Sequence, residues 1–261
     1  MRTRTEVRKA EDCMNLIARR PRSVKGPLPK ATLKAPAAPP NGESSSQPTN
    51  VSADELIWKP IPIWKRVVDV LLSGILIVLL SPILIGIAIY IRLVSPGPAF
   101  FKQSRLGEMG RMFTIYKFRT MHVRDPDVAT REHRQYVTGV ASQQRAVAKP
   151  IYEDRLIPGG EFLRSHSLDE LPQLFNVLNG SMSLVGPRPE VLEWDDYEVW
   201  QLQRFEVTPG MTGLWQVSGK NRLTFQRMVE LDIEYAHRRR LSLDLWIMFR
   251  TIKVVLSRDN G

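Results

Sequence analysis

The sequence contains a single cysteine, Cys13, among its 261 residues. One cysteine cannot build an intramolecular disulfide framework or a multi-cysteine zinc site, and it is consistent with a reducing compartment. The four histidines show no spacing typical of a metal-binding motif; they are His122, His133, His166 and His237. These shortages exclude disulfide-stapled secreted scaffolds and zinc-ribbon modules.

Acidic residues are also in the minority, because 27 Asp and Glu face 37 Lys and Arg, for a net charge of +10. Such an excess indicates an anionic partner: nucleic acid, an anionic membrane surface or a phosphorylated substrate. GxxxxGK[ST], GxGxxG and GxSxG motifs are all lacking, so P-loop, dinucleotide-binding and serine-hydrolase functions have no sequence support. The hydrophobic fraction of 43% excludes both a polytopic membrane protein and a wholly disordered chain.

The first 60 residues contain few large apolar side chains. Residues 21–50 are rich in proline and serine, so they cannot bury enough surface to offset the entropy lost on ordering. The first twenty residues contain no apolar core of the kind found in secretory signal peptides. We therefore predict that residues 1–60 form a disordered, basic, Pro/Ser-rich tail.

Residues 70–91 form a run of 22 residues without a single charge. A straight helix of that length crosses the hydrocarbon core of a bilayer. A core helix of a soluble protein is the alternative, but apolar residues occupy all faces of this one, and the run is longer than most core helices. The sequence therefore predicts a membrane segment.

Two features indicate that residues 61–95 enter the membrane and return on the same side. Ser81 and Pro82 lie at the middle of the apolar run, where proline removes a backbone donor and favours a bend. Positive charge flanks both ends, with Lys65 and Arg66 before the run and Arg92 after it, whereas a spanning helix carries its excess on one side. Spanning helices also tolerate proline kinks, so a spanning helix stays the alternative at this point.

Residues 96–261 are expected to form a cytoplasmic catalytic domain. Aromatic and β-branched runs at 99–103 and 112–117 flank a glycine-containing turn, which predicts a β-hairpin. Helices are predicted from 167 to about 178 and over 190–203, 223–240 and 242–257. The amphipathic pattern of the last one fits a helix at a membrane surface, and it fits packing on the domain core equally well. The predicted class is α+β, with a re-entrant membrane helix, a small β-hairpin and several amphipathic interfacial helices.

The tetrad from Ser167 to Glu170 is the first candidate for chemistry. It matches a capping box, in which Ser167 and Glu170 satisfy the start of a helix, and acidic residues are common there without any catalytic role. Arg164 lies just upstream, however, and Arg188 follows a short distance downstream. Two cations near Asp169 and Glu170 are what a carboxylate nucleophile needs in order to approach a phosphoanion.

Two further segments could support such a site. In the segment 186–189, GPRP, two prolines fix the backbone on either side of Arg188, so little entropy is lost when its side chain is ordered. Lys117 and Arg119 occupy alternate positions at the end of the hairpin and are expected on one face. The glycines of 209–213 are typical of a loop whose backbone approaches a ligand closely. Taken alone, segment 186–189 favours an ordinary turn with a solvated arginine, 117–119 also fits a solvated strand face, and the glycine loop is weak evidence for a site.

Together these segments resemble the bacterial sugar transferases, also called monotopic phosphoglycosyl transferases. The resemblance covers the chain from residue 64 onward, about three quarters of its length. The matching segments are, in order, KRVVDV at 65–70, SP within the apolar run, FKQSRLGEMGRMFTIYKFRTM at 101–121, LRSHSLDELPQLFNVLNGSMSLVGPRPE at 163–190 and PGMTGLWQVSGKN at 209–221. SLDELPQLFNV followed by SLVGPRP is highly specific to this family.

The resemblance implies an activity and a location. Members of the family transfer a sugar 1-phosphate from a UDP-sugar to a polyprenyl phosphate, such as undecaprenyl phosphate, at the cytoplasmic face of the bacterial inner membrane. This step initiates the synthesis of exopolysaccharide, O-antigen or another glycoconjugate, so downstream glycosyltransferases are expected partners. The Ser81-Pro82 break further implies the re-entrant form of the membrane segment.

The resemblance also implies roles for individual residues. Asp169 would be the nucleophile that forms a phosphosugar-aspartate and releases UMP, and Glu170 would help to hold Mg²⁺. Arg164 and Arg188 match arginines of the family's site and would stabilise phosphate. The remaining matched cations, assigned to phosphate or headgroup contact, are Lys117 and Arg119.

Three competing functions are weighed against this one. A catalytically inactive membrane scaffold of glycan assembly would be expected to lack Asp169 or one of the arginines, and all are present. A glycosyltransferase that moves only the sugar would release UDP instead of UMP. A nucleic-acid binder fits the charge but has no nucleic-acid fold motif, and the membrane segment argues against it, so no nucleic-acid partner is expected.

Overall fold

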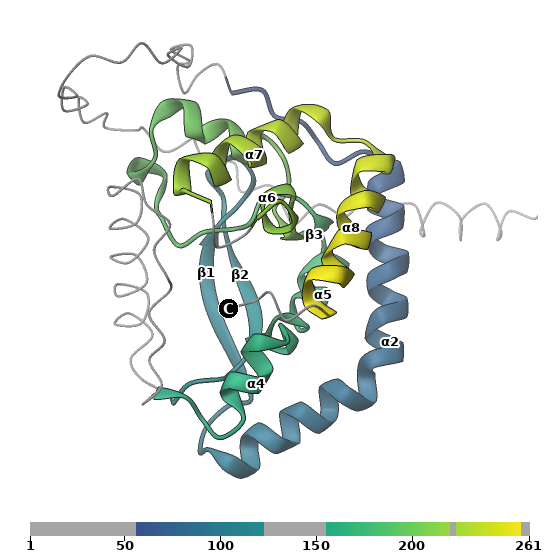
Figure 1. The fold of residues 1–261 in the computed structure, drawn as a ribbon, viewed down its shortest axis with the longest axis vertical. Coiled ribbons are helices and arrows are strands. Elements are labelled where there is room, and N and C mark those ends of the chain that lie inside the picture. Colours follow the sequence, from purple (N-terminus) through teal and green to yellow (C-terminus); the bar gives the residue numbers. More distant parts are fainter. Residues whose placement is uncertain (1–55, 123–154, 220–222, 257–261) are drawn as a thin grey trace, which may run out of the picture.

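The computed structural model describes residues 56–122, 155–219 and 223–256 (Figure 1). The predicted tail, including Cys13, lies outside these ranges except for residues 56–60. There the ammonium group of Lys59 forms an ion pair with Glu206 at 2.6 Å, and the Lys59 N–H donates to the Glu206 carbonyl at 2.9 Å. This short segment is therefore attached to the folded domain.

The membrane segment is a single helix, α2, that extends over Ile63–Val94. Within the described ranges it is the one helix long and apolar enough to cross a membrane, and only 11% of its most apolar window is buried. Its exposed large side chains include Leu71, Ile75, Val78 and Ile83. Exposure of so many apolar side chains does not fit a core helix of a soluble protein, and it agrees with a membrane segment.

The axis of α2 changes direction part-way along its length, in the lower right of Figure 1. Pro82 lies inside the helix and has no N–H to donate to the carbonyl of Val78, four residues earlier. The Ser81 hydroxyl donates to that same carbonyl at 2.7 Å. The Ser-Pro pair therefore combines a bend with a substitute hydrogen bond, which matters where no water can supply one.

The first turns of α2 are joined to the rest of the domain by buried polar contacts. The Lys65 ammonium group donates to Asp244 at 2.5 Å, and Asp244 lies in α8, Leu241–Leu256. The Tyr235 hydroxyl donates to the same carboxylate at 2.8 Å. Asp69 accepts a hydrogen bond from the Leu184 N–H at 2.9 Å. These contacts fix the position of the domain relative to the membrane helix.

The predicted hairpin is confirmed. Strands β1, Phe100–Leu106, and β2, Met112–Phe118, pair antiparallel, with Phe100 opposite Phe118 and Leu106 opposite Met112. The turn contains the short 3₁₀ helix η2, Glu108–Gly110. The Ile115 and Phe118 side chains are buried, so the hairpin forms one wall of the core.

A second small sheet, which the sequence did not predict, consists of two parallel strands, β3, Ser183–Val185, and β4, Gly210–Thr212. The backbones at Gly186 and Gly210 approach so closely that a Cβ built on Gly210 would lie 2.0 Å from the Gly186 nitrogen. The glycines of 209–213 thus allow this backbone segment to pack closely against the segment that follows β3.

The remaining helices agree with the sequence in part. The predicted helices at 223–240 and 242–257 are confirmed as α7, Phe225–Arg238, and α8. The predicted helix from 167 to 178 is divided at Leu171-Pro172 into η4 and α5, and the helix expected over 190–203 is instead two 3₁₀ segments. The shorter elements are α4 (Gly160–Ser165), η4 (Leu168–Glu170), α5 (Gln173–Asn179), η5 (Trp194–Asp196), η6 (Val199–Glu206) and α6 (Leu214–Val217). Mixed helices and two small sheets confirm the α+β class.

Candidate active site

Asp169 and Glu170 lie in η4, immediately after a strained residue. Ser167 has a left-handed backbone conformation, with φ of 55°, which is uncommon for a residue other than glycine. Its side chain makes no capping hydrogen bond, and the Glu170 carboxylate is directed to other partners. The capping-box interpretation is therefore wrong, because the tetrad forms a sharp turn that presents two carboxylates.

Glu170 is held between two cations from distant parts of the chain. Lys117, in β2, and Arg188 each approach its Oε1 atom at 2.7 Å, and Arg188 also contacts Oε2 at 3.4 Å. Burial alone would raise the pKa of Glu170, but the charges of Arg188 and Lys117 outweigh it and hold this pKa well below its ordinary value. Glu170 therefore remains ionised and fixes both cations in place.

Asp169 has a different environment. Within the described ranges, no side chain forms a hydrogen bond or an ion pair with its carboxylate. Burial raises the pKa of Asp169, and the negative charge of Glu170 raises it further, while Lys117, Arg164 and Arg188 act in the opposite direction. Two neighbouring carboxylates are thus driven apart in pKa, one permanently charged and the other more basic than an ordinary aspartate, as in many acid–base and nucleophile pairs.

The segment 186–189, which carries Arg188, is tied down along its backbone. Three consecutive carbonyl groups in it accept hydrogen bonds, from the Gly210 N–H at 2.8 Å, from Arg204 at 3.0 Å and from Arg105 at 3.3 Å. Arg204 in turn forms a buried ion pair with Asp232, in α7, at 2.5 Å. Arg188 is therefore positioned by rigid contacts on both sides of its backbone, as well as by the flanking prolines.

Sequence reasoning missed these supporting residues. Burial raises the pKa of Asp232 to about 7 and lowers that of Arg105 to about 10, so both are ionisable groups in a poorly hydrated environment. Arg105 also lies 3.8 Å from Glu190, which follows the segment 186–189. No local pattern marks such residues, because their oppositely charged partners lie 28 and 85 positions away along the chain.

Arg119 does not join the cluster around Glu170. Its side chain is 4% exposed and donates to the carbonyl groups of Ser95 and Pro96, which follow α2, at 2.8 and 2.5 Å. Lys117 alone of the two hairpin cations reaches Glu170. A phosphate or headgroup contact of Arg119 stays a prediction, and its observed contacts fasten the end of the membrane helix to the hairpin.

The carboxylates do not fit a magnesium site built on Glu170 in this arrangement. Both of its oxygens already accept hydrogen bonds from cationic side chains. Within the described ranges, no group of three or more His, Cys, Asp or Glu residues could hold a metal ion. Binding of Mg²⁺ by Glu170 therefore stays a prediction that would require at least one of its two cations to move.

The chain is similar to known proteins over most of its length. The sequence model described as "Bacterial sugar transferase" matches residues 61–258. A UDP-glucose:undecaprenyl-phosphate glucose-1-phosphate transferase of Caulobacter vibrioides is 41% identical over 208 residues, which are 76% of this chain and 71% of that protein. The exopolysaccharide production protein ExoY of Rhizobium meliloti is 37% identical over 75% of this chain and 87% of its own length.

Other relatives are longer. An undecaprenyl-phosphate galactose phosphotransferase of Salmonella typhimurium is 38% identical over 202 residues, which are 76% of this chain but 41% of that protein. The chain therefore spans less than half the length of some of the curated relatives that it matches. The matched residues include both carboxylates of η4, the segment 186–189 and helix α2.

Proposed function

The chain belongs to the bacterial sugar transferase family, and from this premise we propose that it transfers a sugar 1-phosphate from a UDP-sugar to undecaprenyl phosphate. The proposed reaction passes through a phosphosugar-aspartate on Asp169 and releases UMP. The observation that carries the proposal is the pairing of Glu170, whose carboxylate is held by two cations, with the adjacent, partly buried carboxylate of Asp169, which has no hydrogen-bond or ion-pair partner in the described ranges.

In the first step, a carboxylate oxygen of Asp169 attacks the phosphorus atom that bears the sugar. The bond from this phosphorus to the bridging oxygen breaks, and its electron pair leaves with UMP. Like charges would oppose the approach, but Lys117, Arg164 and Arg188 provide three cations against the two carboxylates of the site. Such prearranged positive charge favours a transition state with added negative charge on phosphate oxygens.

Burial and the charge of Glu170 also make Asp169 more basic than an exposed aspartate. A more basic carboxylate is a stronger nucleophile, provided that it is ionised at the working pH. In the second step, a phosphate oxygen of the polyprenyl phosphate attacks the phosphorus atom of the intermediate. The bond to the aspartate oxygen breaks, Asp169 is restored, and the sugar is left on a lipid diphosphate.

We also propose that α2 is re-entrant and that the domain lies on the cytoplasmic face of the inner membrane. The bend at Ser81-Pro82 and the positive charge at both ends of the helix support this topology. Helix α8 would lie at the membrane surface. Its exposed apolar side chains and the cations that cover two of its aromatic rings are Leu241, Leu245, Trp246, Phe249, Ile252, Arg250 and Lys253.

The proposed reaction is tested by identifying the nucleotide that is released, UMP or UDP. The detergent-solubilised full chain would be incubated with undecaprenyl phosphate, Mg²⁺ and a panel of UDP-sugars, beside the variant Asp169→Asn. We expect UMP from one sugar and at least a thousandfold less from the variant, roughly the loss seen when a nucleophile is removed. Release of UDP, or no release from any sugar, would contradict the proposal and favour a simple glycosyltransferase or a scaffold respectively.

A further inference from the structure

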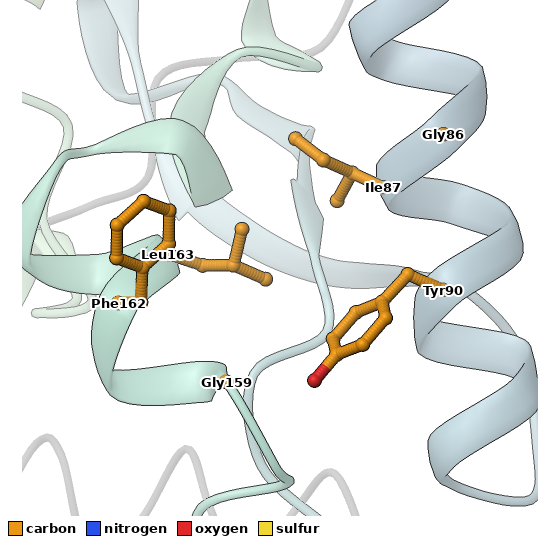
Figure 2. A pocket seen from close by; sticks show the side chains of 6 residues that line it. All are labelled: Gly86, Ile87, Tyr90, Gly159, Phe162 and Leu163. Carbon is orange, nitrogen blue, oxygen red and sulfur yellow. The ribbon is translucent and has the colours of Figure 1, made fainter.

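An apolar pocket of about 440 Å³ lies between the second half of α2 and the helix α4 (Figure 2). It is lined by Gly86, Ile87, Tyr90, Gly159, Phe162 and Leu163. Ile87 and Tyr90 point from α2 toward α4, and Leu163 points back toward α2. The volume lies within the range of small-molecule binding sites and is far larger than the space of one water molecule.

Two glycines lie in the pocket wall, and each leaves space that a side chain would occupy. A Cβ built on Gly86 would have no other atom within 4 Å, so a side chain at this position would extend into free space. Gly159 has a left-handed backbone, and a Cβ on it would lie 2.8 Å from the Tyr90 hydroxyl. That hydroxyl donates to the Pro158 carbonyl at 3.1 Å. The Tyr90 ring is thus held as a fixed wall with its polar atom already engaged.

The pocket lies beside residues that adjoin the candidate active site along the chain. Leu163 directly precedes Arg164, one of the cations that act on Asp169. Leu163 and Ile87 belong to the same apolar cluster as Leu168, which directly precedes Asp169. A ligand with a phosphate at one end and a hydrocarbon chain at the other could therefore place its phosphate at the cations and its first carbons in the pocket.

We infer that this pocket binds the first isoprene units of the acceptor's polyprenyl chain. The inference rests on the function proposed above and assigns one of its substrates to a place in the fold. The UDP-sugar has no apolar portion to fill such a pocket, and the lining offers no free polar side chain for a nucleobase. One wall belongs to the membrane helix itself, so the rest of the chain can continue into the bilayer.

The substitution Gly86→Leu tests this assignment, because it adds an apolar side chain at a lining position where a Cβ meets no other atom, and leucine suits a helix. We expect the concentration of undecaprenyl phosphate that gives half-maximal rate to rise roughly tenfold, since losing the burial of two methylene groups is enough for that change. The same measurement would be made with dimethylallyl phosphate, which has one isoprene unit. Wild type should need less undecaprenyl phosphate than dimethylallyl phosphate for half-maximal rate, and this difference should be smaller in Gly86→Leu. Gly74→Leu is the matched control, because Gly74 also faces open space on α2 but lies outside the pocket.

UMP released in one turnover without acceptor reports the first step separately. If wild type gives no such UMP, the proposed function fails; if it does and Gly86→Leu keeps the wild-type acceptor dependence, the pocket assignment alone fails. If Gly86→Leu raised the half-maximal concentration of undecaprenyl phosphate only when phospholipid is present, the occupant would be a phospholipid acyl chain, and the assignment would also fail. Phe162→Ser is a second test that does not depend on the folding of Gly86→Leu. Phe162 is an exposed residue of the pocket wall, so its loss should also raise the concentration of undecaprenyl phosphate needed for half-maximal rate.

Discussion

Asp169 and Glu170 are adjacent carboxylates, but their surroundings give them different contacts and opposite pKa shifts. Glu170 accepts from Lys117 and Arg188 at 2.7 Å and is ionised at any working pH. Asp169 has its pKa raised by burial and by the charge of Glu170. One residue therefore organises positive charge, and its neighbour is left available for reaction.

The pH dependence of UMP release should report the ionisation of Asp169. In the proposed mechanism the ionised form of Asp169 is the nucleophile. The rate should therefore be maximal above the pKa of Asp169 and should fall as the pH drops through that value. Because Arg164 lowers the pKa of Asp169, Arg164→Gln should move the acid limb of the profile toward higher pH. The measurement is the single-turnover rate of UMP release between pH 4 and about 8 at saturating UDP-sugar.

Arg240→Gln is the control for this prediction, because Arg240 is an exposed cation outside the site. An acid limb at the same pH in wild type and Arg164→Gln would contradict the assignment of Asp169 as the titrating nucleophile.

At the scale of elements, the segment 186–189 owes its position to a close approach between two backbones. A Cβ on Gly210 would clash with Gly186, so Gly210→Ala must push β4 away from β3 and displace Arg188. We expect the variant to lose roughly 1–3 kcal/mol of stability, as overpacked sites do, and most of its activity. Thermal unfolding and UMP release measure the two effects.

Gly74→Ala is the matched control for this substitution, since its added methyl group meets no atom within 4 Å. Alanine also has the higher helix propensity, so this control should be neutral or slightly stabilising. If Gly210→Ala kept wild-type activity and stability, the close approach would not be what positions Arg188.

The elements that could be predicted from the sequence are those with local signals. The hairpin follows from two β-rich runs around a glycine turn, and α7 and α8 follow from helical periodicity. Strands β3 and β4 contain three residues each and pair across more than twenty positions, so no local pattern shows them. The predicted helix at 167–178 is divided at Leu171-Pro172 into η4 and α5, and the left-handed Ser167 lies before both.

The site could be predicted in part for the same reason. Asp169, Glu170 and Arg188 are found by motif, and the structure brings Glu170 and Arg188 together. The roles of Arg204 and Asp232 could not be predicted, because a buried ion pair depends on which helix packs behind the segment 186–189. Arg119 was expected beside Lys117 by strand alternation, but β2 ends at Phe118 and Arg119 turns toward the end of α2.

At the scale of the whole molecule, the membrane helix and the catalytic domain are joined by buried polar contacts. The Lys65–Asp244 pair and the hydrogen bond to Asp69 fasten the start of α2, and Arg119 fastens the segment after its end. If α2 lies in the membrane as proposed, these contacts hold the proposed nucleophile, Asp169, at a fixed height relative to the bilayer. That arrangement suits a reaction between a soluble nucleotide sugar and a lipid phosphate at the headgroup plane.

The proposed re-entrant topology predicts that both ends of α2 face the cytoplasm. Single cysteines at Ile63 and Leu93, which are 81% and 79% exposed, would be introduced with Cys13→Ser. A membrane-impermeant maleimide should label both positions in inside-out vesicles and neither in intact cells. A cysteine at Val78, beside the bend, should remain unlabelled from either side. Labelling of one end from each side would show a spanning helix instead.

The central claim is that Asp169 carries the sugar phosphate between the two half-reactions. The most direct test is to incubate the full chain with its UDP-sugar, radiolabelled at the phosphate attached to the sugar, without any acceptor. We predict one equivalent of UMP and one equivalent of label retained on the protein, with the label discharged on addition of undecaprenyl phosphate and none retained by Asp169→Asn. Product formation with no label ever held by the wild-type protein would contradict this account.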